Sequence, residues 1–157
     1  MKRLPFIKTC MLSCMALTKA SFLLPGCAGL HSVQGKMEES TPNGKILSFL
    51  RSEFTKVKKN GQHATRTSLL LTHPQLKFPI VVFDDGIGDD GMNRYTALWL
   101  ECTHQGNEVN VQGNILSCPG HGSEFDRTGK VIQGPAKKAL HAFEVKTDSD
   151  SVFIVLA

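Results

Sequence analysis

Two short clusters of cysteine and histidine have the residue types and the spacing of metal ligands. One cluster pairs Cys102 with His104, and the other pairs Cys118 with His121. Each is short enough for a single loop to direct both side chains toward a shared point, so two facing loops would supply two sulfur and two nitrogen ligands. That donor set suits a tetrahedral zinc ion, or an iron–sulfur cluster in which two histidines replace two cysteines on one iron.

The spacing within the two clusters favours the iron–sulfur alternative. Zinc fingers usually pair Cys-x2-4-Cys with His-x3-5-His, whereas here each half contributes one cysteine and one histidine. A Cys-x-His half and a Cys-x-x-His half allow the two thiolates to bind one iron and the two imidazoles to bind the other. A module with a structural Cys2His2 zinc site is the alternative from a different functional class.

The residues around these clusters resemble the signature of the Rieske [2Fe–2S] family. CTHQG (102–106), CPGHGSEFD (118–126) and Gly134-Pro135-Ala136 carry the resemblance, which covers roughly the last two-thirds of the chain. It implies an all-β Rieske fold of antiparallel sheets, with a small cluster-binding subdomain at one end. The loop that holds Gly134 and Pro135 is expected to cover the cluster. One [2Fe–2S] cluster would have four ligands, Cys102, His104, Cys118 and His121.

The same resemblance assigns roles to residues near the cluster. Quinol-oxidising members have an extra cysteine in each cluster loop, and the two form a disulfide, but Asn107 and Gly120 occupy those positions here. Those members also have a serine and a tyrosine whose hydroxyls bond the cluster sulfurs. Ser123 matches the serine, whereas Phe125 replaces the tyrosine and has no hydroxyl. We therefore expect a reduction potential below the top of the window of about −150 to +300 mV that histidine ligation produces.

Residues 1–27 have the composition of an export signal. A basic start is followed by a mostly apolar run over residues 9–24, which is too short for a membrane-spanning helix. LPGC (24–27) is similar to a bacterial lipobox, in which the cysteine is lipidated and becomes the new N-terminus. The sequence thus predicts an exported protein that Cys27 attaches to a bacterial membrane. Cleavage near Ala28 with soluble export, and an uncleaved cytoplasmic chain, are the alternatives.

The charge distribution argues against nucleic acid as a partner. The 157 residues carry a formal charge of +4, but four basic residues and no acidic residue precede Cys27. The rest of the chain therefore has equal numbers of basic and acidic residues, and a nucleic-acid-binding role has no electrostatic basis.

Residues 28–44 are rich in glycine, serine, proline and charge, which predicts a flexible tether between the membrane and a domain over residues 45–157. The domain alternates short apolar runs with turns and shows no helical period, which predicts an all-β fold. A turn rich in glycine and aspartate is expected over residues 84–94, without the ligand spacing of a calcium loop. Strands are expected over residues 46–50, 67–71, 79–83, 95–102, 139–145 and 151–156, together with a hairpin over residues 109–118.

The strand over residues 95–102 and the hairpin over residues 109–118 deliver the two cysteines. Thr96, Leu98 and Leu100 share one face of the first strand with Cys102, which we expect this strand to carry out of the core. The second arm of the hairpin ends at Cys118.

One-electron transfer is the function that these features predict. The carrier would be exported and tethered to the membrane, or would be a subunit of a redox complex, with an unidentified protein donor and acceptor. We expect no complete active site in the chain itself, because no second domain supplies the mononuclear iron site of an oxygenase. A soluble Rieske ferredoxin that feeds an oxygenase is the alternative within the redox class.

Overall fold

The computed structural model describes residues 30–40 and 44–156, which form three β-sheets and one short 3-10 helix, η1 (Arg51–Phe54). The largest sheet consists of β1 (Ser32–Gln34), β2 (Lys36–Ser40), β3 (Gly44–Leu50), β6 (Ser68–Thr72), β7 (Ile80–Ile87), β8 (Asn93–Trp99), β13 (Ala142–Thr147) and β14 (Ser151–Leu156). The second sheet consists of β9 (Asn110–Gln112), β10 (Ile115–Ser117), β11 (Glu124–Asp126) and β12 (Val131–Gln133). The third sheet is a hairpin of β4 (Thr55–Val57) and β5 (His63–Thr65).

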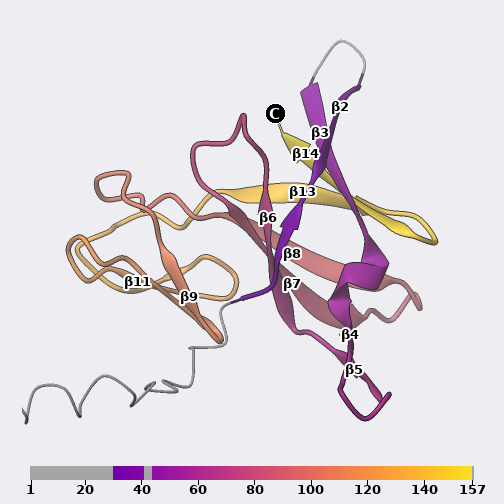
Figure 1. The fold of residues 1–157 in the computed structure, drawn as a ribbon. Coiled ribbons are helices and arrows are strands. Elements are labelled where there is room, and N and C mark those ends of the chain that lie inside the picture. The colour runs from indigo at the N-terminus through magenta and orange to yellow at the C-terminus, as the bar shows by residue number, and fades with distance from the viewer. Residues whose placement is uncertain (1–29, 41–43, 157) are drawn as a thin grey trace, which may run out of the picture.

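The eight strands of the largest sheet have the order β1-β6-β7-β8-β13-β14-β3-β2. β1 and β2 lie at opposite ends of this order, yet Gly35 alone separates them in the chain, so the sheet closes into a barrel (Figure 1). A Cβ on the buried Gly35 would lie 2.7 Å from Leu47 Cγ and 3.0 Å from Leu71 Cδ1. Glycine is required here because the strand crosses the corner of the barrel in contact with the core.

β7 and β8 are buried on both faces. Ile80, Val82 and Ala97 face the barrel interior, where they belong to a core cluster with Leu47 and Ile154. The alternate residues Val81, Phe83 and Leu98 belong to a second core cluster that is shared with the four-stranded sheet. This double burial explains why residues 79–83 form a continuous apolar run.

The four-stranded sheet packs on the outside of β7 and β8 together with the loops that flank its strands. We call this region, residues 101–140, the Cys–His lobe. Figure 1 shows the lobe beside the barrel, with β9 and β11 labelled, and shows the β4–β5 hairpin projecting elsewhere from the fold. In the lobe the strands have the order β12-β11-β10-β9 and are antiparallel.

The expected all-β class with antiparallel sheets is confirmed, with β1 and β6 as a parallel pair. The expected strand over residues 151–156 coincides with β14, and the hairpin over residues 109–118 forms as β9 and β10. The expected turn over residues 84–94 is too long, because β7 extends to Ile87 and β8 begins at Asn93. No helix in the described ranges is long and apolar enough to span a bilayer.

The prediction of a flexible tether is wrong for the part of residues 28–44 that the structure describes. β1 pairs with β6, and β2 pairs with β3, so residues 32–40 belong to the barrel. The predicted signal segment, including Cys27, lies outside the described residues. The β4–β5 hairpin, which was not predicted, lies in the polar connection between the first two expected strands.

Candidate functional site

Two loops of the Cys–His lobe have the same hydrogen-bond pattern around a cysteine. The Cys102 amide donates to the Asn107 carbonyl at 2.8 Å, and the Gly106 amide donates to the Cys102 carbonyl at 2.8 Å. The second loop repeats this pattern: the Cys118 amide donates to Ser123 O at 2.8 Å and the Gly122 amide to Cys118 O at 3.0 Å. Each loop is therefore a closed turn that holds its cysteine at a fixed position.

Gly106 and Gly122 are functional positions that the sequence analysis did not identify. Both have a positive φ, of 70° and 74°, a conformation that glycine adopts without steric cost. Each lies four residues after a cysteine, and this repeated Cys-x3-Gly spacing was the available signal.

The two loops bring like donors together. Cys102 and Cys118 are both buried, and neither forms a disulfide. Their two sulfur atoms are neighbours. His104 and His121 are exposed, and their rings pack edge to face with centroids 4.9 Å apart. The arrangement is a pair of sulfurs at the core side and a pair of imidazoles at the solvent side.

Burial raises the pKa of the Cys102 thiol above its ordinary value. The backbone amide of His104 opposes this effect by donating toward the sulfur, and the neighbouring Cys118 raises the pKa further. A metal that binds this sulfur as thiolate must therefore displace a proton that the site itself favours. Cys102 stays in the core cluster at 2% exposure, so the expectation that the strand carries it out of the core is wrong.

Asn107 and Gly120 face each other across the two loops. A Cβ on Gly120 would lie only 2.0 Å from Asn107 Nδ2, so the amide of Asn107 occupies the space above the glycine. These are the positions of the two extra cysteines in the quinol-oxidising members that the resemblance named. The loops are thus in contact here without a covalent link.

A third loop, residues 134–140, lies against both cysteine loops. The buried Ser123 Oγ accepts a hydrogen bond from the Ala136 amide at 3.0 Å, and Thr103 Oγ1 donates to the Lys138 carbonyl at 2.6 Å. This loop contains the cis peptide bond between Gly134 and Pro135. The structure therefore places the expected covering loop beside both cysteine loops.

Phe125 lies in β11 opposite Leu116 and is fully buried. It belongs to the core cluster that contains Cys102 and Cys118. The ring thus lies among apolar side chains of the core to which both cysteines belong.

The donor set, two sulfurs in one pair and two imidazoles in another, fits a two-iron cluster. A cluster with two sulfur ligands on one iron and two nitrogen ligands on the other needs two separate pairs of this kind.

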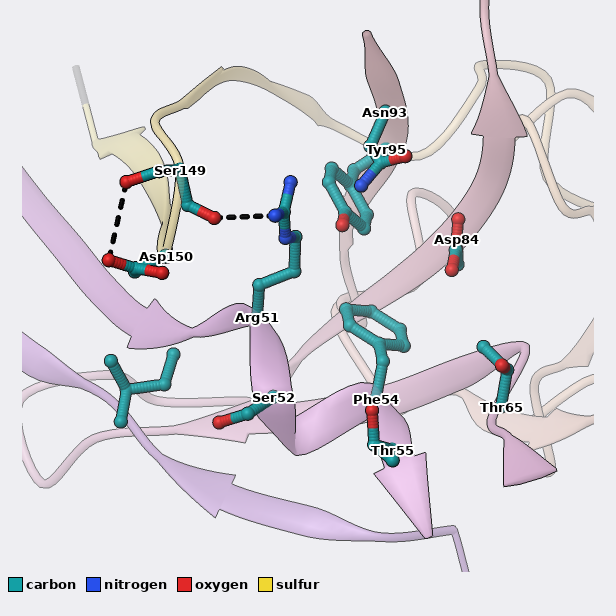
Figure 2. A pocket seen from close by; sticks show the side chains of 11 residues that line it. Arg51, Ser52, Phe54, Thr55, Thr65, Asp84, Asn93, Tyr95, Ser149 and Asp150 are labelled. Carbon is teal, nitrogen blue, oxygen red and sulfur yellow. Dashed lines mark hydrogen bonds between the residues drawn. The ribbon is translucent and has the colours of Figure 1, made fainter. Parts of the chain in front are cut away.

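A cavity of about 650 Å³ lies at the other end of β7 and β8 (Figure 2). Phe54 and Tyr95 stack there with ring centroids 5.3 Å apart, and the Arg51 guanidinium donates to the Ser149 carbonyl. Burial and the charge of Asp84 raise the pKa of Tyr95. The lining combines Arg51 with two aspartates, so its charge does not indicate one class of ligand.

The chain matches a known family over the region that contains this site. The model of the Rieske [2Fe-2S] domain matches residues 52–144, which is more than half of the chain. Among curated proteins, the cytochrome b6-f complex iron-sulfur subunit of Synechococcus sp. (strain WH7803) is 38% identical over 108 residues. This alignment covers 60% of the chain and 57% of that subunit.

Two further relatives are similar. The cytochrome b6-f complex iron-sulfur subunit of Synechococcus sp. (strain RCC307) is 43% identical over 77 residues, which cover 48% of this chain and 40% of that subunit. The chain thus spans about half of the length of the curated relatives that it matches. Among solved structures, the cyanobacterial plasma membrane Rieske protein PetC3 from Synechocystis PCC 6803 is 32% identical in sequence to this chain. The superposition covers 58% of this chain and 87% of PetC3, with a TM-score of 0.45. The chain belongs to the Rieske [2Fe–2S] domain family, and its cofactor is one [2Fe–2S] cluster.

Proposed function

We propose that this chain is a membrane-attached one-electron carrier whose [2Fe–2S] cluster is held by Cys102 and Cys118 on one iron and by His104 and His121 on the other. The single observation that carries the assignment is the separation of the donors into a buried sulfur pair and an exposed imidazole pair. When bound, the cluster supplies reversible one-electron chemistry.

The chain's own residues position and shield that cluster. The two closed turns hold the cysteines, and the Asn107–Gly120 contact keeps the turns together. Ser123 accepts a bond from the Ala136 amide, which leaves its hydroxyl proton available to donate toward a cluster sulfur. Gly134 and Pro135 lie in the third loop, which would cover one side of the cluster. His104 and His121 face solvent, where a partner's redox centre can approach.

Metal analysis of the purified protein tests the ligand assignment. We expect two irons and two labile sulfides per chain and a red-brown colour, which Cys118→Ser should abolish. Thr103→Ser serves as the control, since it keeps the hydroxyl that donates to Lys138 and should keep the colour. Stoichiometric zinc without sulfide would contradict the assignment.

The names of the relatives support an attachment to the membrane. PetC3 is described as a plasma membrane protein, and the b6-f subunits belong to a complex. For this chain, the lipobox-like LPGC (24–27) supports lipidation of Cys27 on the exported side of a bacterial membrane. Mass spectrometry of the protein from its own cells should find a mature N-terminus at Cys27 that carries lipid. A mature chain that begins beyond Cys27 would refute the anchor.

The donor and the acceptor would be proteins, because the exposed imidazole pair offers a contact edge rather than a substrate cavity. The chain would then act as a subunit or partner of an oxidoreductase. Co-purification of the membrane-extracted protein with its partners tests this: a haem or iron–sulfur protein should accompany the wild type.

A further inference from the structure

The connection between the proposed anchor and the fold is short. Only Ala28 and Gly29 separate Cys27 from Leu30, where the described fold begins, and β1 starts at Ser32. A fully extended chain spans at most about 3.6 Å per residue, so Leu30 lies within about 11 Å of a lipidated Cys27. Leu30 packs against the core that the barrel strands β7 and β8 share with the Cys–His lobe. The fold must therefore rest close to the membrane at the place where Leu30 lies.

The β4–β5 hairpin begins beside Leu30. Leu30 and His31 line a cavity of about 440 Å³ together with Lys56, Thr65 and Arg66. Lys56 is in β4, and Arg66 directly follows β5. The entry of the chain and the base of this hairpin thus share one face of the molecule.

This hairpin is strongly basic. No acidic residue occurs between Phe54 and Phe83 in the sequence, whereas the hairpin and its base hold three exposed lysines, one exposed histidine and one arginine. We call these five residues the basic hairpin: Lys56, Lys58, Lys59, His63 and Arg66.

The positive charge of the basic hairpin is not neutralised within the described chain. None of its three lysines forms an ion pair with a described residue. The Arg66 guanidinium donates to the carbonyls of Glu53 and Thr55, which carry no net charge. The exposed Val57, between Lys56 and Lys58, adds an apolar side chain to the same hairpin.

Some of the carboxylates near the basic hairpin are engaged by other side chains. Glu53 pairs with His31 at 3.0 Å. On the neighbouring β7–β8 hairpin, Asp85 pairs with Arg127 at 2.6 Å and Asp90 pairs with Arg94 at 3.1 Å. Asp84, which lines a cavity with Thr55 and Thr65, forms no ion pair among the described residues. The three lysines and Arg66 outnumber this carboxylate, and their field acts within a Debye length of about 8 Å.

We propose that the basic hairpin docks on anionic lipid headgroups and so fixes the orientation of the protein on its membrane. The inference rests on the lipidated Cys27 proposed above. Two independent observations meet here: the connection is too short to lift the barrel off the surface, and the face nearest the anchor carries unpaired lysines. Clusters of basic residues at an anionic leaflet are attracted to it.

Docking of this kind turns the cluster away from the bilayer. Thr55 and Thr65 line the same cavity as Asn93, at the start of β8, whereas Cys102 follows the end of β8. A strand of this length spans roughly 20 Å. His104 and His121 then face the aqueous phase, where a redox partner meets them, and the domain has no long tether on which to swing.

Amide hydrogen exchange on vesicle-bound protein tests the docking. The full lipidated chain would be reconstituted into phosphatidylcholine vesicles, with or without one third phosphatidylglycerol, and followed by mass spectrometry. We expect the amides of residues 55–66 to exchange about fivefold more slowly with phosphatidylglycerol present. This factor corresponds to the attraction of about 1 kcal/mol between one basic residue and an anionic lipid surface. High salt should remove the protection, and residues 134–141 in the Cys–His lobe should not respond.

A matched pair of variants separates docking from anchoring. Lys56→Gln/Lys58→Gln/Lys59→Gln should lose the protection, whereas Lys137→Gln/Lys138→Gln/Lys146→Gln should keep it. Flotation of the vesicles reports the anchor separately. Protein that does not float refutes the anchor and, with it, the docking. Protein that floats with equal exchange of residues 55–66 in both lipids, or with protection of residues 134–141 instead, overturns the docking alone.

Discussion

The barrel and the Cys–His lobe are stabilised by different kinds of interaction. Barrel strands such as β3, β7 and β8 have seven or eight residues and enclose a continuous apolar core. All four strands of the lobe have three residues each. Two hydrogen bonds between side chain and backbone join its loops. The Thr103 hydroxyl donates to the Lys138 carbonyl, and the Ala136 amide donates to the Ser123 hydroxyl oxygen.

This difference indicates which region depends on the cofactor. Strands of three residues are too short to be stable alone, and the sulfur pair belongs to the core that the lobe shares with β7 and β8. With Cys102 and Cys118 as the proposed ligands, the cluster would act as part of the core of the lobe. The barrel has its own core, which contains none of the four proposed ligands.

The largest effect should come from removal of the cluster. In Cys118→Ser, or after chelation of the iron, we expect amides of β9 to β12 to exchange at least about a hundredfold faster, because metal ligation and folding of the lobe are coupled. Amides of β3 and β14 should keep their protection. Hydrogen exchange by NMR measures both regions at once. Equal loss of protection in both regions would show that the barrel depends on the cluster too.

A substitution at the corner of the barrel should destabilise the barrel rather than the Cys–His lobe. Gly35→Ala places a Cβ against Leu47 and Leu71 in the core, and overpacking of this kind costs about 1–3 kcal/mol of unfolding free energy. Denaturant unfolding measures the loss, which should appear in the barrel before the lobe. Leu47→Ala serves as the partner in a double-mutant cycle, and the double variant should cost less than the sum of the two single changes. Additive costs would mean that the two side chains do not collide.

The chemistry of the site was predictable because it is local in sequence. Each cysteine lies within three residues of a histidine, and the turn that holds each cysteine closes within six residues. Strand β14 was equally clear, since Val152 and Ile154 alternate with less buried neighbours and fill the barrel. Local patterns of this kind need no knowledge of the rest of the fold.

The strands β1 and β2 could not be recognised from the same rules. Val33, Gly35 and Met37 do alternate toward the interior, but the middle position is a glycine, which hides the apolar period. Glycine is there because the barrel closes at that point, a constraint that comes from Leu47 and Leu71 far along the chain. The β4–β5 hairpin was missed because its side chains are mostly polar and exposed, so it has almost no core face.

The contact between the two cysteine loops gives an intermediate effect. Gly120→Ala would place a Cβ against the amide of Asn107, which ends an exposed side chain that can move aside. We therefore expect a cost of no more than about 1 kcal/mol, at the low end for overpacking, and loss of the cluster no more than about fivefold faster. Decay of the visible absorbance under chelator measures the rate. Asn107→Ala/Gly120→Ala removes the collision and should be more stable than Gly120→Ala alone. A double variant that decays as fast as the single one would show that the glycine is needed for another reason.

Phe125→Tyr tests whether this ring lies close enough to the cluster to influence its potential. If the new hydroxyl donates to a cluster sulfur, the hydrogen bond should stabilise the reduced state over the oxidised state by about 0.5–1.5 kcal/mol. For one electron, about 59 mV corresponds to a tenfold change in the equilibrium constant, so the potential should rise by roughly 20–65 mV. Voltammetry measures the shift. Phe143→Tyr, in β13 on the barrel, is the matched control and should leave the potential unchanged. An unchanged potential in a folded Phe125→Tyr variant would refute the proposed role of this position.

The smallest effect concerns the turn that leads from β11 to β12. Asp126 accepts bonds from the Thr128 hydroxyl at 2.6 Å, from the Thr128 amide at 2.8 Å and from the Lys130 amide at 3.1 Å. The Thr128 hydroxyl is the main reason why the pKa of this carboxyl is lowered in the folded protein. A lowered pKa means that the carboxylate stabilises the folded lobe above the ordinary pKa of an aspartate, and that this contribution is lost as the pH falls through the folded-state value.

Asp126→Asn should therefore lower the unfolding free energy of the lobe at neutral pH by no more than about 0.5–1 kcal/mol, because the carboxylate is well solvated. The variant should also lose less stability than the wild type between about pH 5 and pH 2, since it no longer has a carboxylate to protonate there. Asp89→Asn, on the exposed turn between β7 and β8, removes one carboxylate from the barrel and should leave the lobe unchanged. Hydrogen exchange across this pH range, corrected for the intrinsic rate, assigns the effect to a region. A parallel pH response of β11 in wild type and Asp126→Asn would mean that the turn is held by its backbone alone, as the barrel strands are.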